Sequence, residues 1–334
     1  MNIIIPMAGM GKRLRPHTLT VPKPLIPIAG KPIVQRLVED IATVCGEPIQ
    51  EIAFVTGTFG LDVERRLLAI AASVGAKGHI CYQHEALGTA HAVLCGAESL
   101  QGNVIVAYAD TLFRADFRLA TEQEAIVWVQ RVPNPGAFGV VNLDETGEIT
   151  GFVEKPEHFI SDLAIIGIYY FREGAYLKQE LQFLIDHDIQ VKGEYQLTDA
   201  LENMRKKGTK FVPGQVQEWL DCGNKEATVQ TNQRYLEAIQ ETDLVASTAV
   251  LVNSVVIPPV FIGENVYIEN TVVGPHVSVG NNTRISGSVV RNCIVQENSV
   301  IENVNLADSM LGSFVRVAGK PLDLSVGDYN VLRV

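Results

Sequence analysis

The sequence is poor in positive charge and has no paired cysteines. It contains 27 lysines and arginines against 38 aspartates and glutamates, which gives a formal net charge of −11 at pH 7. Because binding to a polyanion needs a positive field over a broad surface, nucleic acids and acidic membranes are excluded as partners. The five cysteines form no Cys-x-x-Cys pair, so neither a zinc site nor a redox dithiol is predicted. Scattered thiols of this kind fit a reducing cytoplasm.

A secretion signal and a membrane helix are not predicted either. The chain starts Asn2-Ile3-Ile4-Ile5-Pro6, without a basic segment ahead of a long apolar one, so we expect no export. The stretch from Leu244 to Gly263 carries no charge over a length that could span a bilayer. It also contains Pro258-Pro259 and many β-branched residues, which favour short buried strands. We therefore expect a cytoplasmic protein.

The first 235 residues alternate between strand-like and helix-like segments. Short apolar runs over residues 3–6, 52–55 and 104–107 predict strands. Apolar residues at helical spacing predict helices over residues 33–44, 61–74 and 90–100. This alternation predicts an α/β domain with a Rossmann-like, mainly parallel sheet covered by helices on both faces. Ligands of such sheets bind at the carboxyl ends of the strands.

After about residue 235 the apolar pattern changes to a six-residue repeat. The repeat is carried by Ile262, Ile268, Val279, Ile285, Val295, Ile301 and Ala307. It predicts a short left-handed β-helix of hexapeptide type, and a set of ordinary antiparallel strands is the alternative. We therefore expect a domain of residues 1–235, a linker of residues 236–249 and a β-helix domain of residues 250–334.

A loop that contains glycines and basic residues follows the first predicted strand. It includes Gly9, Gly11, Lys12 and Arg13, and residues 1–38 contain no acidic residue at all. Glycines let backbone N–H groups approach phosphate oxygens, and Arg13 and Lys23 add fixed positive charge. The loop lacks the Gly-Lys-Ser/Thr ending of a P-loop and the three spaced glycines of a dinucleotide site. A small anion is the predicted ligand, and a flexible turn with solvated charges is the alternative.

This loop, together with Lys23-Pro24-Leu25, resembles the signature of the sugar nucleotidylyltransferases. That family includes glucose-1-phosphate thymidylyltransferases and mannose-1-phosphate guanylyltransferases. Further matching segments follow in the family's order over about two thirds of the chain. They are Gln83 with Leu87-Gly88-Thr89-Ala90, Asp110, Phe138-Gly139-Val140-Val141, Val153-Glu154-Lys155-Pro156, Gly193-Glu194 and Trp219-Leu220-Asp221-Cys222-Gly223. The chain departs from the pattern at Met10, Lys12 and Ala109.

The resemblance implies a role for each matched position. Gly9, Gly11 and Arg13 would hold the triphosphate, and Lys23 would neutralise its phosphates. Gln83 and Gly88 would recognise the base, and Ala8 and Thr89 would also bind the nucleotide. Asp110 and Asp221 would hold Mg²⁺. The sugar phosphate would be bound by Phe138, Gly139, Glu154, Lys155 and Lys192. Arg13, Lys23 and Lys155 would be the catalytic charges.

Each matched residue also has a purely structural interpretation. Asp110 and Asp221 could cap turns, and Glu154 with Lys155 could form an exposed ion pair. His84 and His91 flank the segment that would bind the base, and we assign no role to either from the sequence.

The implied reaction is attack by a sugar-1-phosphate on a nucleoside triphosphate, with release of pyrophosphate. A phosphate monoester is largely dianionic at neutral pH and needs no general base. This agrees with the absence of a Ser-His or Cys-His arrangement. We prefer dTTP or UTP with glucose-1-phosphate, because the amide of Gln83 suits thymine or uracil.

Three alternatives to this function remain open. They are a mannose-1-phosphate guanylyltransferase, an enzyme with added acyltransferase activity in its β-helix, and a regulatory nucleotide-sugar-binding protein without catalysis. The open ends of a β-helix and the uncharged residues Leu244 to Gly263 also predict a homo-oligomer.

Overall fold

The structure, a computed structural model, describes residues 1–320 and 322–332. The chain divides into two compact units. One consists of Met1–Ile26 with Lys31–Thr228, and the other consists of Pro27–Gly30 with the chain from Val229 onward. The division falls inside helix α6 (Lys225–Ala238). The domain boundaries expected at residues 235 and 249 stay a prediction.

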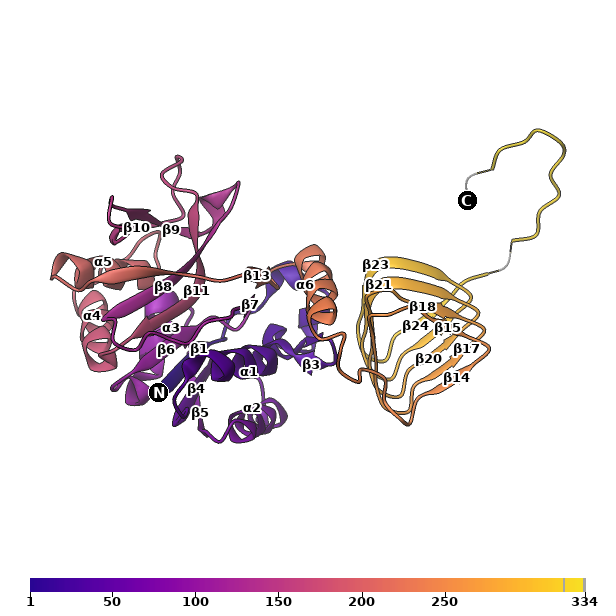
Figure 1. Cartoon of the computed structure of the whole chain (residues 1–334), viewed down its shortest axis with the longest axis horizontal. Coiled ribbons are helices and arrows are strands. Elements are labelled where there is room, and N and C mark those ends of the chain that lie inside the picture. Colours follow the sequence, from indigo (N-terminus) through magenta and orange to yellow (C-terminus); the bar gives the residue numbers. More distant parts are fainter. Residues whose placement is uncertain (321, 333–334) are drawn as a thin grey trace. The chain divides into compact units, whose positions relative to one another are not determined.

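A nine-stranded sheet forms the centre of the first unit (Figure 1). Four parallel strands lie in the order β6 (Val104–Ala107), β1 (Asn2–Pro6), β4 (Glu51–Thr56) and β5 (Lys77–Tyr82). The other five are β8 (Ala125–Arg131), β9 (Gly139–Leu143), β10 (Ile149–Glu154), β11 (Leu163–Phe171) and β12 (Phe211–Gln215). β11 runs antiparallel to β6, β8 and β9. The Rossmann-like parallel arrangement is thus confirmed for the N-terminal strands, and antiparallel strands make the whole sheet mixed.

Helices cover both faces of this sheet. They are α1 (Ile33–Cys45), α2 (Leu61–Ser73), α3 (Thr89–Cys95), α4 (Gly174–Asp186) and α5 (Leu197–Lys206). Residues of α3, α4 and α5 share one apolar cluster with Ile4 of β1 and Val55 of β4. Right-handed crossovers from β1 to β4 and from β4 to β5 place α1 and α2 on the opposite face. The helix expected over residues 90–100 ends at Cys95 and is followed by a 3₁₀ turn, Ala97–Ser99.

A two-stranded sheet lies beside the main one. β7 (Thr111–Arg114) pairs antiparallel with β13 (Glu218–Asp221), and Thr111 faces Asp221 in the register. Because β7 begins directly after Asp110, this pairing brings two distant acidic positions next to one another.

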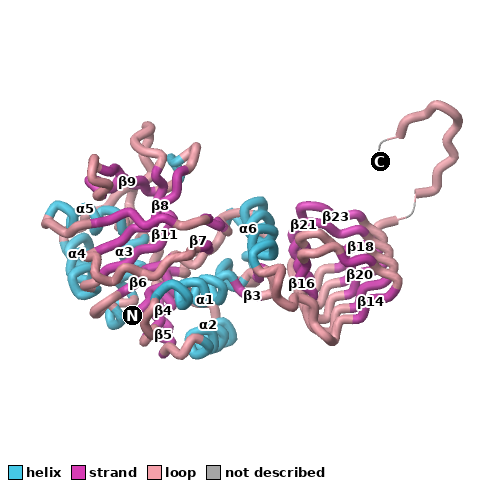
Figure 2. The backbone as a smooth tube through the Cα atoms, viewed as in Figure 1, coloured by secondary structure: helices cyan, strands magenta, loops and turns pink. Residues whose placement is uncertain are grey.

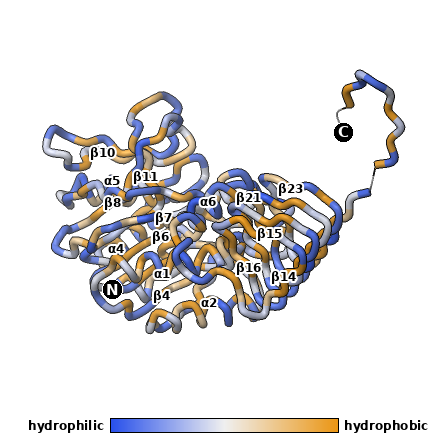
Figure 3. The backbone as a smooth tube through the Cα atoms, turned by 45° about the vertical axis from the view of Figure 1, so that its right-hand side comes forward, coloured by the Kyte–Doolittle hydropathy of each residue, from blue (hydrophilic) through white to orange (hydrophobic). Residues whose placement is uncertain are grey.

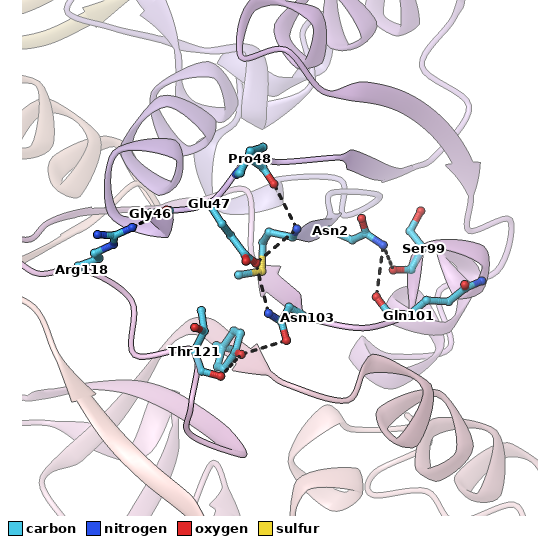
Figure 4. Close-up of polar contacts among 11 residues, drawn as sticks. Asn2, Gly46, Glu47, Pro48, Ser99, Gln101, Asn103, Arg118 and Thr121 are labelled. Atoms are coloured by element: carbon cyan, nitrogen blue, oxygen red, sulfur yellow. Dashed lines mark hydrogen bonds and ion pairs between the residues drawn. The ribbon is translucent and has the colours of Figure 1, made fainter.

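Polar contacts tie the amino ends of the parallel strands (Figure 4). The amine of Met1 lies 3.4 Å from Glu47 Oε1, and Asn103 Nδ2 donates to the same oxygen at 3.3 Å. Asn2 Nδ2 donates to the carbonyl oxygen of Ser99 at 3.1 Å. These contacts connect β1 with the segments that precede β4 and β6, and the carboxyl ends of the strands are where ligands of such sheets bind.

The second unit winds into coils of short parallel strands joined by turns, with no helix within the described coils (Figure 2). The strands are β14 (Val250–Val252), β15 (Val255–Val256), β16 (Val260–Ile262), β17 (Tyr267–Glu269), β18 (Val272–Val273), β19 (Val277–Val279), β20 (Arg284–Ser286), β21 (Val289–Val295), β22 (Val300–Glu302), β23 (Asn305–Leu311) and β24 (Arg316–Ala318). Strands of successive coils pair in parallel, as β17 with β20 and β20 with β22. The predicted β-helix is confirmed, and its coils are consistent with the left-handed type.

The six-residue repeat becomes stacked columns of buried side chains. Ile268, Ile285 and Ile301 lie in register and are fully buried. Ala307 was expected to continue the repeat, but it pairs with Arg291, and Leu306 packs against the apolar core instead. The next core residue after Ile301 is five positions on, as it is after Ile268 and after Ile285, so a strict six-residue repeat passes the column by one residue. Hydrophobic strands therefore alternate with hydrophilic corners along each coil (Figure 3).

The uncharged stretch from Leu244 to Gly263 forms the first coil. It contributes β14, β15 and β16, and its large apolar side chains on the first two strands are partly exposed. None of the helices in the described part of the chain is long and apolar enough to cross a bilayer.

Candidate active site

Two adjoining cavities lie at the carboxyl ends of the parallel strands. The larger, of about 680 Å³, is lined by the loop after β1, by Gln83 after β5 and by Asp110 after β6. The smaller, of about 200 Å³, is lined by residues of β9, β10 and β11, by the start of α5 and by Asp221. The residues that line both cavities are Arg13, Thr89, Tyr108, Asp110 and Lys155.

The loop after β1 presents backbone to the larger cavity. Gly11 has a φ of +56°, and a Cβ there would lie 3.0 Å from Lys23 Cβ. Thr18 Oγ1 donates to the carbonyl oxygen of Gly11 at 2.8 Å, and the fully buried Leu14 anchors the loop in the core. The glycine is therefore required both for the positive φ and for close packing against Lys23. This geometry leaves Ala8, Gly9 and Gly11 lining the cavity.

A buried lysine sits against the first acidic residue. Lys23 Nζ lies 2.6 Å from Asp110 Oδ2, and the lysine side chain is only 9% exposed. The backbone of Cys222 donates to the carbonyl oxygen of Asp110 at 3.0 Å, which continues the pairing of β7 with β13. Asp221 is thereby held beside Asp110.

The two carboxyl groups repel one another. Burial raises the pKa of Asp221, and the nearby charge of Asp110 raises this pKa further, against the opposing effects of Lys23 and Arg13. Asp221 Oδ1 accepts a hydrogen bond from the backbone of Gly223 at 2.9 Å, which fixes the carboxylate.

This pair suits a cation that also takes ligands from a substrate. Among the described residues, no group of three or more His, Cys, Asp or Glu side chains could hold a metal ion on its own. Mg²⁺ is commonly held by one or two carboxylates together with substrate phosphates, and it prefers oxygen ligands. Asp110 and Asp221 fit that requirement, and a cation there would relieve their repulsion.

A bulge in β11 shapes the smaller cavity. The pairing of β11 with β8 shifts between Ile165 and Tyr169, and Gly167 within this bulge has a φ of +87°. A Cβ on Gly167 would lie 2.6 Å from Tyr108 Cδ2. The rings of Tyr108 and Tyr169 meet edge to face, with centroids 5.9 Å apart. The glycine thus allows an aromatic wall to form beside the cavity.

Charged groups project from the end of β10 into the same cavity. Glu154 pairs with Gly139 of β9, and Glu154 Oε2 accepts a hydrogen bond from Thr198 Oγ1 at 3.2 Å. Lys155 has a φ of +41°, and its Nζ lies 3.3 Å from Glu154 Oε1. Its backbone N–H donates to the carbonyl oxygen of Phe138 at 3.1 Å. The carboxylate and the ammonium of adjacent residues are therefore both available to one polar ligand.

The predicted site residues, with one exception, line one of the two cavities. The exception is Lys192, which is exposed and lies 3.7 Å from Glu157 Oε1, so its proposed contact to phosphate stays a prediction. Residues missed in the sequence include Tyr108, Tyr169 and Thr198, which also line the smaller cavity. The signal that could have found the bulge was the isolated Gly167 within an apolar strand.

Residues 2–238 match the family described as nucleotidyl transferase. The chain belongs to the nucleotidyl transferase family. The match covers the strands of the first unit, the loop after β1, Asp110 and Asp221, and the residues of both cavities.

Several known nucleotidyltransferases are similar to the chain. It is 30% identical over 245 residues to the low-salt glycan biosynthesis nucleotidyltransferase Agl11 of Haloferax volcanii, covering 71% of this chain and 66% of that protein. It is 28% identical over 359 residues to a glucose-1-phosphate thymidylyltransferase of Streptomyces griseus, covering 96% and 94%. A solved UDP-glucose pyrophosphorylase complexed with UDP-glucose has a TM-score of 0.59 and 26% identity, covering 71% of this chain and 98% of that one. Against several other curated relatives, this nucleotidyl transferase spans little more than half of their length.

Proposed function

We propose that this nucleotidyl transferase joins a nucleoside triphosphate to a sugar-1-phosphate and releases pyrophosphate. The observation that carries the proposal is the junction of the two cavities at Arg13, Asp110 and Lys155. The larger cavity offers a backbone loop and positive charge to a triphosphate, and the smaller offers a carboxylate and an ammonium to a phosphorylated sugar. The reacting phosphates would then meet at the residues shared by both.

The chemistry of the lining residues supports a position for each substrate. Backbone N–H groups of the loop from Ala8 to Gly11 would donate to the triphosphate, and Arg13 would add positive charge. In the smaller cavity Glu154 would accept hydrogen bonds from sugar hydroxyls, and Lys155 would bind the phosphate of the sugar.

The reaction needs positioning and charge neutralisation. An oxygen of the sugar phosphate would attack the α-phosphorus in line, forming a new P–O bond while the bond to the β-phosphate breaks and pyrophosphate departs. The attacking phosphate is largely a dianion at neutral pH, so no residue has to remove a proton. Arg13, Lys23 and Lys155 would stabilise the charge that builds on the phosphates. Mg²⁺, held by Asp110 and Asp221, would supply further neutralisation of phosphate oxygens when bound.

We propose dTTP or UTP and glucose-1-phosphate as the preferred substrates. The preference is supported by Gln83, which lines the larger cavity, and by the similarity to a thymidylyltransferase and to a UDP-glucose pyrophosphorylase. A mannose-1-phosphate guanylyltransferase remains the second candidate, because an amide can also pair with guanine.

Acyl transfer by the β-helix is less favoured. His276 is the one histidine of this unit, and its Nε2 lies 3.1 Å from Glu237 Oε1 of helix α6. It sits at a corner of a coil with a φ of +63°. The contact to Glu237 engages Nε2, so Nδ1 of this single imidazole is the candidate base left in the unit.

We also propose a cellular compartment and an oligomeric state for the enzyme. The five cysteines are free thiols, which supports a reducing cytoplasm. The first coil of the β-helix exposes Val250, Leu251 and Val255 on edge strands and Ile257 directly after β15, which supports a homo-oligomer that covers them.

The test is a matrix of five nucleoside triphosphates against the 1-phosphates of glucose, mannose, galactose and N-acetylglucosamine. Pyrophosphate release is measured with Mg²⁺ and, as the control, with an excess of chelator. The expected result is Mg²⁺-dependent release that is fastest with dTTP or UTP and glucose-1-phosphate. Binding of nucleotide without any release would indicate a regulatory protein, and fastest release with GTP and mannose-1-phosphate would establish the second candidate.

A further inference from the structure

One amide at the wall of the larger cavity contacts two hydrogen-bond acceptors. Gln83 follows β5, Gly88 directly precedes α3, and His91 is the third residue of α3. Gln83 Nε2 donates to the carbonyl oxygen of Gly88 at 3.1 Å and lies 3.1 Å from His91 Nδ1. Neither contact was expected from the sequence.

The chemistry of these neighbours determines which way the amide points. A backbone carbonyl oxygen can only accept, so the amide atom that faces Gly88 must be the nitrogen. Its second proton then points toward His91, and Nδ1 must carry a lone pair to receive it. His91 is therefore the neutral tautomer with its proton on Nε2. Burial lowers the pKa of His91, which favours this neutral form, although Glu85 opposes the effect.

In the opposite orientation, Oε1 of Gln83 would face the lone pairs of the Gly88 carbonyl oxygen and of His91 Nδ1, and acceptors repel one another. Both protons of Nε2 are engaged, and no residue in the described part of the chain donates to Oε1. The acceptor oxygen is thus the polar atom that Gln83 has left for a ligand.

The acceptors themselves are held in place. Gly88 has a φ of +106°, and a Cβ there would lie 2.4 Å from the carbonyl oxygen of Tyr195. Ala90, at the start of α3, donates its backbone N–H to the same oxygen at 2.9 Å. This close packing fixes the first turn of α3, and with it the direction from which His91 approaches Gln83.

We propose that His91 is a positioning residue that, together with the carbonyl oxygen of Gly88, holds the amide of Gln83 with Oε1 toward the nucleotide base. This orientation favours bases whose ring nitrogen on the pairing edge carries a proton, as N3 does in uracil and thymine and N1 does in guanine. Cytosine and adenine present a lone pair at the corresponding nitrogen and would be disfavoured. This inference rests on the proposed function and narrows its nucleotide to UTP, dTTP or GTP.

The test compares UTP with CTP, two pyrimidine nucleotides of similar size. The ratio of their kcat/KM values, with one sugar-1-phosphate, is measured in the wild type and in His91→Ala, His91→Asn and His84→Ala. Alanine removes one of the two acceptors and leaves the amide held by Gly88 alone, so the preference for UTP should fall about tenfold. Asparagine can offer Oδ1 where His91 offers Nδ1 and should keep the ratio within about threefold of the wild type. His84 is exposed and stacks on Tyr82, with ring centroids 5.7 Å apart, so His84→Ala should leave the ratio unchanged.

Two results would overturn the inference. One is a His91→Ala variant that discriminates against CTP as strongly as the wild type. The other is a His91→Asn variant that loses discrimination as fully as His91→Ala, because the lone pair would then not be the cause.

Binding measurements separate this inference from the proposed function. Calorimetric Kd values for UDP and CDP in the same four proteins give the base preference without any turnover. If the wild type releases no pyrophosphate but His91→Ala still loses its preference for UDP, the proposed reaction is wrong and the role of His91 stands. An unchanged preference for UDP over CDP in His91→Ala refutes that role, whatever the turnover.

Discussion

Asp110→Asn and Asp221→Asn should change the stability of the protein in opposite directions, although both should remove most of its activity. Lys23 is 9% exposed at its side chain and lies 2.6 Å from Asp110 Oδ2, while the Asp110 side chain is 39% exposed. Asp110→Asn therefore removes the carboxylate that contacts this buried ammonium and leaves Asp221 as the remaining negative charge near it. Exposed ion pairs contribute up to about 1 kcal/mol to stability, and breaking a buried pair costs about 3–5 kcal/mol. The Lys23–Asp110 pair is intermediate in burial, so we expect Asp110→Asn to lower the free energy of unfolding by about 2 kcal/mol.

Asp221 should behave in the opposite way. Burial, and then the charge of Asp110, raises its pKa in the folded protein. The folded state thus holds this proton more tightly than the unfolded state, and stability is lost as the pH rises through the raised pKa. Asp221→Asn removes the ionisation and keeps an oxygen to accept from Gly223. At pH 7.5 the variant should be at least as stable as the wild type, and its stability should depend less on pH.

The assay is scanning calorimetry of metal-free protein at pH 5 and pH 7.5, combined with kcat for pyrophosphate release in Mg²⁺. For a unit of this size, 2 kcal/mol corresponds to about 5 °C in Tm. Each substitution should lower kcat at least about a hundredfold, because each removes one of the two carboxylates that would hold Mg²⁺ beside the reacting phosphates. Asp116→Asn is the matched control, since this exposed carboxylate lines neither cavity. Equal Tm shifts of the same sign in Asp110→Asn and Asp221→Asn, or near-normal turnover in both, would refute the reasoning.

Three further predictions concern the sugar phosphate, the bulge and the β-helix. Lys155→Ala should raise KM for the sugar-1-phosphate about tenfold or more, while the Kd for the triphosphate, measured by calorimetric titration, should stay nearly unchanged. Equal weakening of both substrates would mean that Lys155 has a general electrostatic role. Gly167→Ala should destabilise the protein by about 1–3 kcal/mol and raise KM for the sugar-1-phosphate, because the positive φ and the ring of Tyr108 leave no room for a Cβ. A variant with the Tm and KM of the wild type would show that the bulge adapts to the added methyl group. A chain ending at Glu241 should still release pyrophosphate but have a smaller assembly or a lower Tm, since Asn232 loses its bond from Ser278 at 2.7 Å. If light scattering shows an unchanged assembly while catalysis is lost, the β-helix belongs to the active site.

The sequence by itself determined the features that depend on local pattern. Helix α1 follows from apolar residues at Ile33, Leu37 and Ile41, and the β-helix follows from a six-residue repeat, because backbone periodicity places such residues on one face. The loop from Gly9 to Arg13 is predicted to bind phosphate because glycines and positive charge stand together in the chain.

The tertiary structure alone decided how distant residues meet. Asp221 lies beside Asp110 only because β13 pairs with β7 in one register. The bulge at Gly167 and the contact of Gln83 with His91 likewise depend on packing between separate elements. A sequence pattern carries the period of a helix or strand, but it does not carry the register between strands or the direction of a side chain. Those depend on long-range packing, in which each residue's position is set by neighbours far away in the chain.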